Sequence, residues 1–234
     1  MVKKKYPCMA LGTFQRTYDE LLSLFKAYPY NKMFIDTAYR YENEDSVSEA
    51  INDSGYPKEN IAYIGKICFA QQTGNSSVEN ELKRTLKRLM IDTIDVYMIH
   101  SSRYERYVDT WSQIIDLKEK GFIRSIGVSN FTIEALESLL IKTGICPDIV
   151  QVVYNPLNEN SKTKEIIEYC NNHQIAIEAA MPFGGKESLY AHSECFREEI
   201  IKKLLNRNII SIIGTSNERH MLENFSVLER VKYV

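Results

Sequence analysis

Eight short apolar runs, each rich in Ile and Val, recur along the 234-residue chain and alternate with segments of helical periodicity. Runs of this kind are typical of strands buried on both faces, and their alternation with helices favours a parallel sheet. Eight strand–helix units of about 29 residues each predict a closed (β/α)8 TIM barrel of the α/β class, with residues 1–234 as a single domain. The expected strands cover residues 8–13, 33–36, 61–66, 94–100, 123–128, 149–153, 175–179 and 209–213.

Helical segments lie between these runs, with apolar side chains repeating every three or four residues. The clearest of them cover residues 78–90, 109–120 and 197–206. Helix starts are predicted from N-cap residues, and a Ser or Thr followed three residues later by Glu has the spacing of a capping box. The expected N-caps are Thr17 and Ser46, both followed by such a Glu, and Ser161 and Ser216.

Several folds and partner classes are disfavoured by what the sequence lacks. There is no Gly-x-Gly-x-x-Gly turn and no Walker pattern, which argues against an open, doubly wound nucleotide-binding sheet. A net charge of −2 does not suit nucleic acid, and no apolar stretch approaches the roughly 18 residues of a membrane span. Five scattered cysteines fit free thiols in a reducing compartment. We therefore expect a cytoplasmic monomer that binds neither nucleic acid nor membrane.

Polar side chains follow three neighbouring strands at the carboxyl ends, where a barrel of this kind has its active site. Asp36, Lys66 and His100 end the second, third and fourth expected strands, and Tyr41 follows the second. A buried lysine needs an anion, which Asp36 supplies, and the cation should lower the pKa of Tyr41 from its reference of about 10. With His100 hydrogen-bonding a substrate oxygen, these groups suit proton transfer to a carbonyl. A reduction would also need a hydride-donating cofactor.

Each of these residues also has a structural interpretation. Taken alone, Asp36 fits a turn or helix N-cap, Lys66 a structural ion pair and His100 a hydrogen-bonded structural histidine. Tyr41 is one of 15 tyrosines. The presence of all four on successive strands favours a catalytic site. An aldolase that forms a Schiff base on Lys66 is the enzymatic alternative. A metal-dependent hydrolase is disfavoured because the four histidines include no His-x-His pair, and we expect no metal.

Six sequence motifs, arranged in the same order along the chain, resemble those of the aldo-keto reductases. Three of them resemble the signatures of that family, namely DTAYRYENE, GFIRSIGVSNF, and IIGTSN together with LEN. The resemblance extends from residue 9 to residue 225, nearly the whole chain. The matching segments are residues 11–13, 36–44, 97–100, 121–131, 151–156 and 212–224.

The resemblance implies a role for each candidate residue. Tyr41 would act as the general acid in the reduction of an aldehyde or ketone, a small-molecule carbonyl substrate, and His100 would orient the carbonyl group. Lys66, paired with Asp36, would tune Tyr41. The implied cofactor is NADPH, or NADH in its place, without a metal. Ser129, Asn130 and Gln151 would hold its carboxamide, Thr13 and Asp36 would lie near the nicotinamide ribose, and Gly214, Thr215, Ser216, Glu223 and Asn224 would hold the adenosine end.

Two departures from the family's pattern concern the cofactor. Ala180 stands where an aromatic residue usually ends the seventh strand and stacks on the nicotinamide. Gly214 and His220 stand where many relatives carry the Lys and Arg that contact the 2′-phosphate, so we expect a weaker preference for NADPH. The nearby side chains that offer a ring, a thioether or a cation instead are Tyr154, Met181, Phe183, Arg207 and Arg219.

The loop lengths predict an open site. The segment after His100 and residues 184–194 are short, and the sequence ends ten residues after Asn224, without the family's C-terminal substrate loop. We therefore expect a shallow pocket that admits bulky substrates. A non-catalytic NADP(H)-binding module is the alternative from a different functional class. The retention of all four polar groups argues against it.

Overall fold

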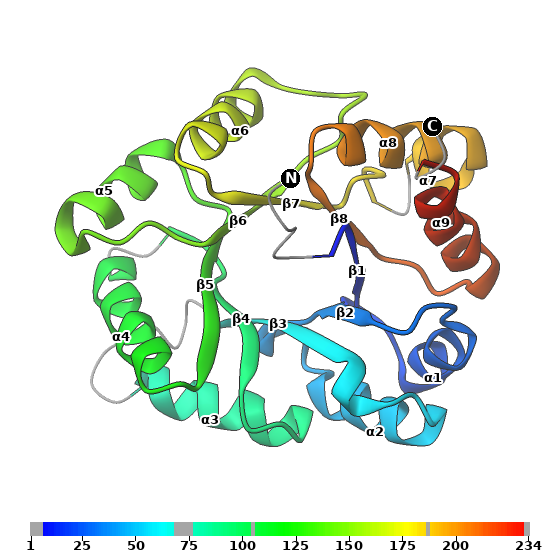
Figure 1. The fold of residues 1–234 in the computed structure, drawn as a ribbon, viewed down its shortest axis with the longest axis horizontal. Coiled ribbons are helices and arrows are strands. Elements are labelled where there is room, and N and C mark those ends of the chain that lie inside the picture. The colour runs from blue at the N-terminus through cyan, green and yellow to red at the C-terminus, as the bar shows by residue number, and fades with distance from the viewer. Residues whose placement is uncertain (1–6, 68–76, 104–105, 186–187, 232–234) are drawn as a thin grey trace.

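Eight parallel strands close into a barrel in chain order, with β1 pairing both β2 and β8 (Figure 1). The computed structural model describes residues 7–67, 77–103, 106–185 and 188–231. This closed order confirms the predicted (β/α)8 barrel. Each strand lies between the barrel interior and the helices, which is why apolar side chains cover both of its faces. The strands are β1 (Met9–Gly12), β2 (Met33–Asp36), β3 (Ile61–Ile67), β4 (Ile94–Ile99), β5 (Ile123–Ser129), β6 (Ile149–Val153), β7 (Ala176–Ala180) and β8 (Ile210–Ile213).

Helices surround the barrel (Figure 1). The three segments with the clearest helical periodicity are confirmed as α3, α4 and α8, with small differences at their ends. A short helix, α7, precedes α8, and two 3-10 helices, η1 and η2, precede and follow α2. The helices are α1 (Tyr18–Ala27), η1 (Tyr39–Tyr41), α2 (Glu44–Ser54), η2 (Lys58–Asn60), α3 (Ser77–Leu89), α4 (Tyr107–Glu119), α5 (Ile133–Thr143), α6 (Ser161–Asn172), α7 (Leu189–His192), α8 (Glu194–Asn206) and α9 (Glu218–Val231).

The core has two parts because side chains alternate across each strand. The larger part lies between the strands and the helices, and the smaller part fills the barrel interior. On four of the strands, a polar residue lies two positions after an inward-facing apolar residue. It therefore also faces the barrel interior, near the carboxyl end of the strand. The apolar interior residues are Ala10, Phe34, Ile64, Val96, Met98, Ile149, Ile210 and Ile212. The buried polar residues beside them are Asp36, Lys66, Gln151 and Glu178.

One of the four predicted N-caps is correct. Thr17 forms the expected capping box with Glu20 ahead of α1. The prediction for Ser46 is wrong, since α2 begins two residues earlier and its N-cap position is occupied by Asn43. The predictions for Ser161 and Ser216 are each wrong by one residue. The side chains that accept from the first-turn backbone amides are those of the neighbouring residues Asn160 and Asn217.

Two expectations drawn from composition are tested by the fold. In the described part of the chain, no helix is both long and apolar enough to span a membrane. Cys146, Cys170 and Cys195 are free thiols, as predicted, and Cys68 lies outside the described residues. Parts of the two loops predicted to be short, at 104–105 and 186–187, also lie outside them.

Candidate active site

The buried ammonium group of Lys66 connects β2, β3 and η1 at the carboxyl end of the barrel. Its Nζ lies 2.6 Å from Asp36 Oδ2 and donates a 3.1 Å hydrogen bond to the carbonyl oxygen of Thr37. It also donates to the Tyr41 hydroxyl oxygen at 3.2 Å. Lys66 and Asp36 are both buried. The predicted ion pair is therefore present, and it contacts the predicted proton donor.

The turn after β2 determines where Tyr41 lies. A hydrogen bond from Tyr41 N to Ala38 O folds the chain into η1 directly after the strand. The centre of the Phe14 ring lies 5.0 Å from that of the Tyr41 ring, and Phe14 is 55% exposed, so it forms an apolar surface beside the Tyr41 ring. Phe14 is not among the site residues predicted from the sequence. Its position immediately after Thr13, at the end of the first predicted strand, was the available signal.

The electrostatic expectation for Tyr41 is wrong in its net direction. Burial raises the pKa of the Tyr41 phenol above its ordinary value, and the Lys66 cation opposes this rise without cancelling it. Burial would by itself lower the pKa of Lys66, but the Asp36 carboxylate and Tyr41 bring it above its ordinary value. The prediction had the sign of the Lys66 effect right and neglected the larger cost of an anion in a buried site.

His100 follows β4 beside Tyr41, with the two ring centres 6.0 Å apart. Burial, together with the Lys66 and Arg40 cations, lowers the pKa of His100 to about 4. The imidazole is therefore neutral at pH 7 and offers one N–H as a hydrogen-bond donor. Its buried Nδ1 has no partner among the described residues. A neutral donor next to a phenol suits binding of a carbonyl oxygen.

Ser129, Asn130 and Gln151 form a second set of polar contacts, at the ends of β5 and β6. The Ser129 hydroxyl donates to Gln151 Oε1 at 3.0 Å, and Asn130 Nδ2 donates to Ser129 Oγ at 3.0 Å. Asn130 Nδ2 also donates to the His100 carbonyl oxygen at 3.2 Å. Gln151 Nε2 donates to Asp36 Oδ2 at 2.9 Å, which joins this set to the ion pair. The structure thus brings these three predicted residues together with the first group.

Glu178 belongs to the same network and was missed by the sequence argument. It is 0% exposed, and its Oε2 accepts a 3.1 Å hydrogen bond from Gln151 Nε2. The available signal was a lone carboxylate within the apolar run IAIEA, since an ionisable side chain in a doubly buried strand must point into the barrel.

Thr13 lies at this end of the barrel, but its hydroxyl group already donates a hydrogen bond to a backbone carbonyl oxygen. Its Oγ1 and its N–H both donate to the Asp36 carbonyl oxygen, at 3.1 and 3.0 Å. The side chain is fully buried. Thr13 therefore joins the ends of β1 and β2, which positions Asp36.

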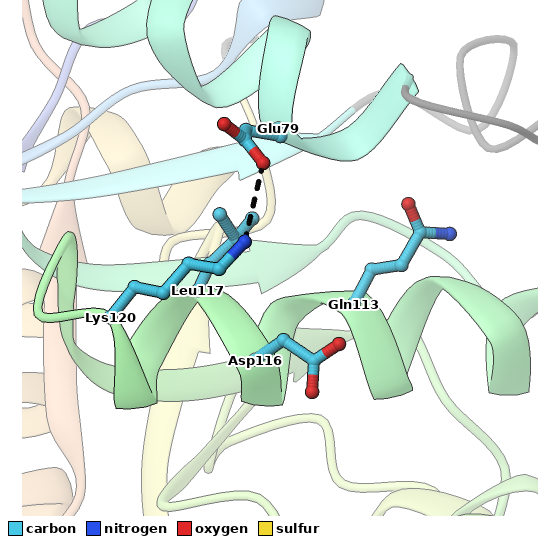
Figure 2. Close-up of a pocket in the computed structure, with 5 residues that line it drawn as sticks. All are labelled: Glu79, Gln113, Asp116, Leu117 and Lys120. Carbon is cyan, nitrogen blue, oxygen red and sulfur yellow. Dashed lines mark hydrogen bonds and ion pairs between the residues drawn. The ribbon is translucent and has the colours of Figure 1, made fainter.

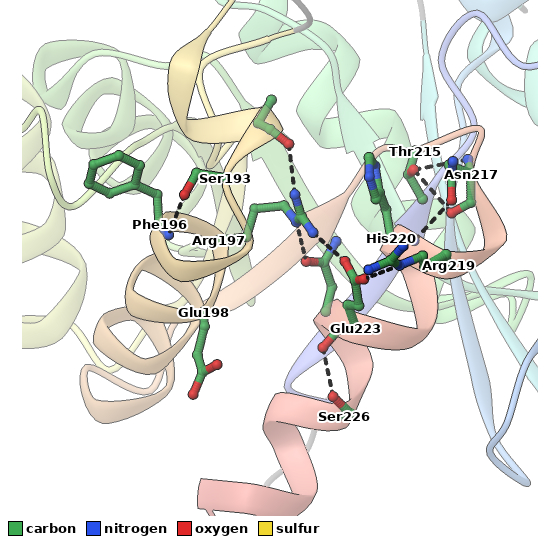
Figure 3. A network of polar contacts seen from close by, with 12 residues as sticks. Ser193, Phe196, Arg197, Glu198, Thr215, Asn217, Arg219, His220, Glu223 and Ser226 are labelled. Atoms are coloured by element: carbon green, nitrogen blue, oxygen red, sulfur yellow. Dashed lines mark hydrogen bonds and ion pairs between the residues drawn. The ribbon is translucent and has the colours of Figure 1, made fainter.

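Two of the predicted adenosine residues, Glu223 and Asn224, belong to a separate network between α8 and α9 (Figure 3). Arg197 donates to Glu223 Oε2 at 2.5 Å and to Asn224 Oδ1 at 3.0 Å. Arg219 contacts the other Glu223 oxygen at 2.6 Å. The predicted groups Glu223 and Asn224 are thus already paired, and Arg197 is the buried cation that sequence reasoning missed.

The loop between β8 and α9 carries the other predicted adenosine residues. Thr215 Oγ1 accepts a 3.1 Å hydrogen bond from Asn217 N, and Ser216 is exposed between them. Gly214 is exposed, and a Cβ added there would meet no atom within 4 Å. The loop therefore has open space around Gly214.

The end of β7 lacks an aromatic side chain, as the sequence predicts. Ala180 is the last strand residue. Among the three proposed substitutes for the ring, Tyr154 and Phe183 are buried in the outer core, and Met181 is 55% exposed. Tyr154 also hydrogen-bonds Glu159 and Arg207. Only Met181 of these three is therefore exposed enough to contact a ligand.

A small surface pocket lies away from these residues, between α3 and α4 (Figure 2). It is lined mainly by charged and polar side chains, and Lys120 Nζ is paired with Glu79 Oε2 at 3.4 Å. It contains none of the predicted site residues. Within the described ranges, no group of three or more His, Cys, Asp or Glu side chains is arranged to hold a metal ion.

Comparison with known proteins agrees with the resemblance in the sequence. The family model for the Aldo/keto reductase family matches residues 11–198. Methylglyoxal reductase DkgA of Yersinia pestis is 32% identical over 203 residues, covering 85% of this chain and 69% of the relative. Glyoxal reductase of Bacillus subtilis is 30% identical over 204 residues, covering 83% of this chain and 72% of that protein.

Solved structures agree with these relatives. An aldo-keto reductase from Brucella melitensis matches with a TM-score of 0.84 at 30% identity, covering 95% of this chain and 89% of that one. An aldo-keto reductase from Bombyx mori, solved in complex with NADP, matches with a TM-score of 0.81 at 25% identity, covering 96% and 84%. This chain therefore belongs to the aldo-keto reductase family, whose members reduce carbonyl groups with NADP(H).

Proposed function

We propose that this protein reduces a small aldehyde or ketone to an alcohol, using NADPH or NADH and a proton from Tyr41. The observation that carries the proposal is the placement of Lys66, whose ammonium group contacts the Tyr41 hydroxyl and the Asp36 carboxylate. A fixed cation stabilises the phenolate that forms when the proton leaves. Lys66 thus lowers the cost of proton transfer at the Tyr41 oxygen, against the effect of burial.

The residues at the ends of β5 and β6 fit a carboxamide. Both hydrogens of Gln151 Nε2 and both of Asn130 Nδ2 are engaged within the protein. Gln151 Oε1 accepts one hydrogen bond, and Asn130 Oδ1 accepts none from the described residues. Acceptor positions therefore remain on both amide oxygens, one for each donor of a carboxamide –NH2. The bound nicotinamide would supply the hydride.

His100 and Phe14 complete the proposed substrate position. The neutral His100 ring donates a hydrogen bond to the carbonyl oxygen. Because the ring is uncharged, no charged group has to lose its water when the substrate binds. Phe14 offers an exposed apolar face to the rest of the substrate. Two relatives are named for methylglyoxal and glyoxal, so small dicarbonyl aldehydes are the first substrates to test.

The aldolase alternative is disfavoured by the state of Lys66. A Schiff base requires a neutral amine with a free lone pair. Lys66 Nζ instead has three acceptors, and its pKa lies above the ordinary value. The amine is therefore protonated at neutral pH, and it is not a nucleophile.

Two measurements test the proposed function. Calorimetric titration with NADPH and NADH should detect binding of at least one of them. Oxidation of the bound cofactor should then follow addition of glyoxal, methylglyoxal or a larger aldehyde. Binding without turnover of any carbonyl would favour the non-catalytic module. If neither cofactor bound, the reductase proposal would be wrong.

A further inference from the structure

Glu178 places a second carboxyl group inside the barrel, close to the ion pair of Asp36 and Lys66. It lies in the middle of β7, where its neighbours in register are Gln151 on β6 and Ile210 on β8. The side chain is 0% exposed. Burying an ionised carboxylate is unfavourable unless a cation or several donors compensate. The protonation state of Glu178 therefore depends on the donors and cations around it.

The hydrogen bonds of Glu178 do not suit an anion. Its Oε2 accepts from Gln151 Nε2, and the same nitrogen donates to Asp36 Oδ2. Its Oε1 has no hydrogen-bond partner in the described part of the chain. An ionised carboxylate has about four acceptor positions. One shared donor leaves most of them unsatisfied.

The charges around Glu178 also disfavour its ionised form. Lys66 is the cation that faces it, and that ammonium group is already paired with Asp36 at 2.6 Å. Two ionised carboxylates would then share one cation. In such an arrangement one carboxyl group retains its proton. The titratable groups that interact with Glu178 from the elements around it are Asp36 on β2, Lys66 on β3 and Tyr41 in η1.

We propose that Glu178 is a positioning residue that carries a proton in the active enzyme, and that loss of this proton makes Tyr41 a weaker acid. The inference rests on the proposed role of Tyr41. Glu178 acts through Gln151, Asp36 and Lys66, which link it to the phenol. When it ionises, the new negative charge disfavours the Tyr41 phenolate. Burial and the Asp36 charge raise the pKa of Glu178 to about 8.

The first test is the pH profile of Glu178→Gln, which is neutral at every pH and nearly isosteric. The single-turnover rate of carbonyl reduction is measured with cofactor bound, from pH 6 to pH 10. In the wild type the rate should fall by roughly threefold to tenfold as the pH rises through the Glu178 transition. The variant should lack this step, and its KM at pH 6 should match that of the wild type.

Glu44→Gln is the matched control. Glu44 is also buried, and burial also raises its pKa, but it contacts Thr85 and Arg88 outside the barrel. Its replacement should leave the alkaline step in place. Identical profiles for wild type and Glu178→Gln would overturn the proposal. If Glu178→Gln does not fold, Glu178→Leu is a second neutral variant for the same comparison.

A spectroscopic measurement tests the proton without relying on activity. Infrared difference spectra between pH 6 and pH 10 should show the loss of one protonated carboxyl group in the wild type and in Glu44→Gln. The signal should be missing in Glu178→Gln. If the protein shows this signal but reduces no carbonyl, the proposed function is wrong, and the proposal that Glu178 carries a proton still holds. If the wild type has no such signal, the Glu178 proposal is wrong, whatever the activity.

Discussion

The two ends of the proposed cofactor site are built in different ways. At the nicotinamide end, Asp36, Lys66 and Gln151 are buried and hydrogen-bonded to one another, and the strand register places them. At the adenosine end, one ion pair between α8 and α9 and one within α9 engage Glu223, and Arg219 is 82% exposed. The first end is preformed by the barrel. At the second end, a ligand has to compete with contacts that the protein already makes.

This difference indicates where substitutions should act. A buried, fully paired group has no alternative arrangement, so its removal should cost both rate and stability. An exposed ion pair contributes little to stability, because water screens it and long side chains lose entropy when they are fixed. Substitutions at the nicotinamide end should therefore have the larger effects.

Tyr41→Phe should have the largest effect on the rate. The change removes one oxygen atom and leaves the ring against Phe14. Carbonyl reduction should slow by roughly 10²–10⁴-fold, which is the usual contribution of a positioned general acid. Cofactor affinity should stay near the wild-type value, since the proposed carboxamide contacts come from other residues. Single-turnover rates and calorimetry measure the two quantities. A folded, cofactor-bound variant with a near wild-type rate would mean that the proton comes from elsewhere.

Lys66→Met should lower stability as well as activity. It leaves the Asp36 carboxylate buried with Gln151 Nε2 as its remaining side-chain donor. Removing one partner of a buried ion pair costs about 3–5 kcal/mol. Denaturant unfolding of the variant measures this loss. The exposed pair of Lys83 and Glu79 provides the control, because Lys83→Met should change stability by less than about 1 kcal/mol. Equal losses in the two variants would contradict the proposed difference between buried and exposed pairs.

The sequence was sufficient to predict the strands and the first polar group. Apolar runs gave the strand positions, and the barrel topology brings strand ends together, so Asp36, Lys66 and His100 had to lie near one another. The pKa of Tyr41 could not be predicted in the same way. Its net shift depends on how far the phenol is buried, which only the packed structure determines.

Helix starts and long-range ion pairs were harder to predict. The capping-box spacing that starts at Ser46 lies inside α2. A Ser followed three residues later by Glu also occurs within helices, so this spacing alone does not identify a helix start. Asn43, at the true N-cap position, donates instead to the carbonyl oxygens of Thr13 and Arg16. The pairing of Arg197 with Glu223 joins residues 26 positions apart on separate helices, and local sequence patterns do not specify it.

The smallest effect is expected at the adenosine end, for the preference between NADPH and NADH. A charge-assisted hydrogen bond to a phosphate contributes about tenfold in affinity. Gly214 and His220 provide no basic pair, and Arg219 is already bound to Glu223. A 2′-phosphate would have to share the Arg219 guanidinium with the Glu223 carboxylate, whose negative charge weakens that contact. We therefore expect the ratio of the two dissociation constants to stay below about a thousandfold, and to change by less than about tenfold in Arg219→Gln.

Calorimetric titration of both cofactors into wild type and Arg219→Gln tests this expectation. Arg230→Gln is the matched control, because Arg230 also lies on α9 and pairs with a glutamate of α8, Glu198, at 3.2 Å. It should leave the ratio unchanged. A thousandfold preference for NADPH that collapses in Arg219→Gln, but not in Arg230→Gln, would mean that Arg219 binds the 2′-phosphate strongly despite its contact with Glu223. In that case the Arg219 guanidinium would serve two anions, with its Nε on Glu223 and its other N–H groups on the phosphate, or it would exchange one anion for the other on binding.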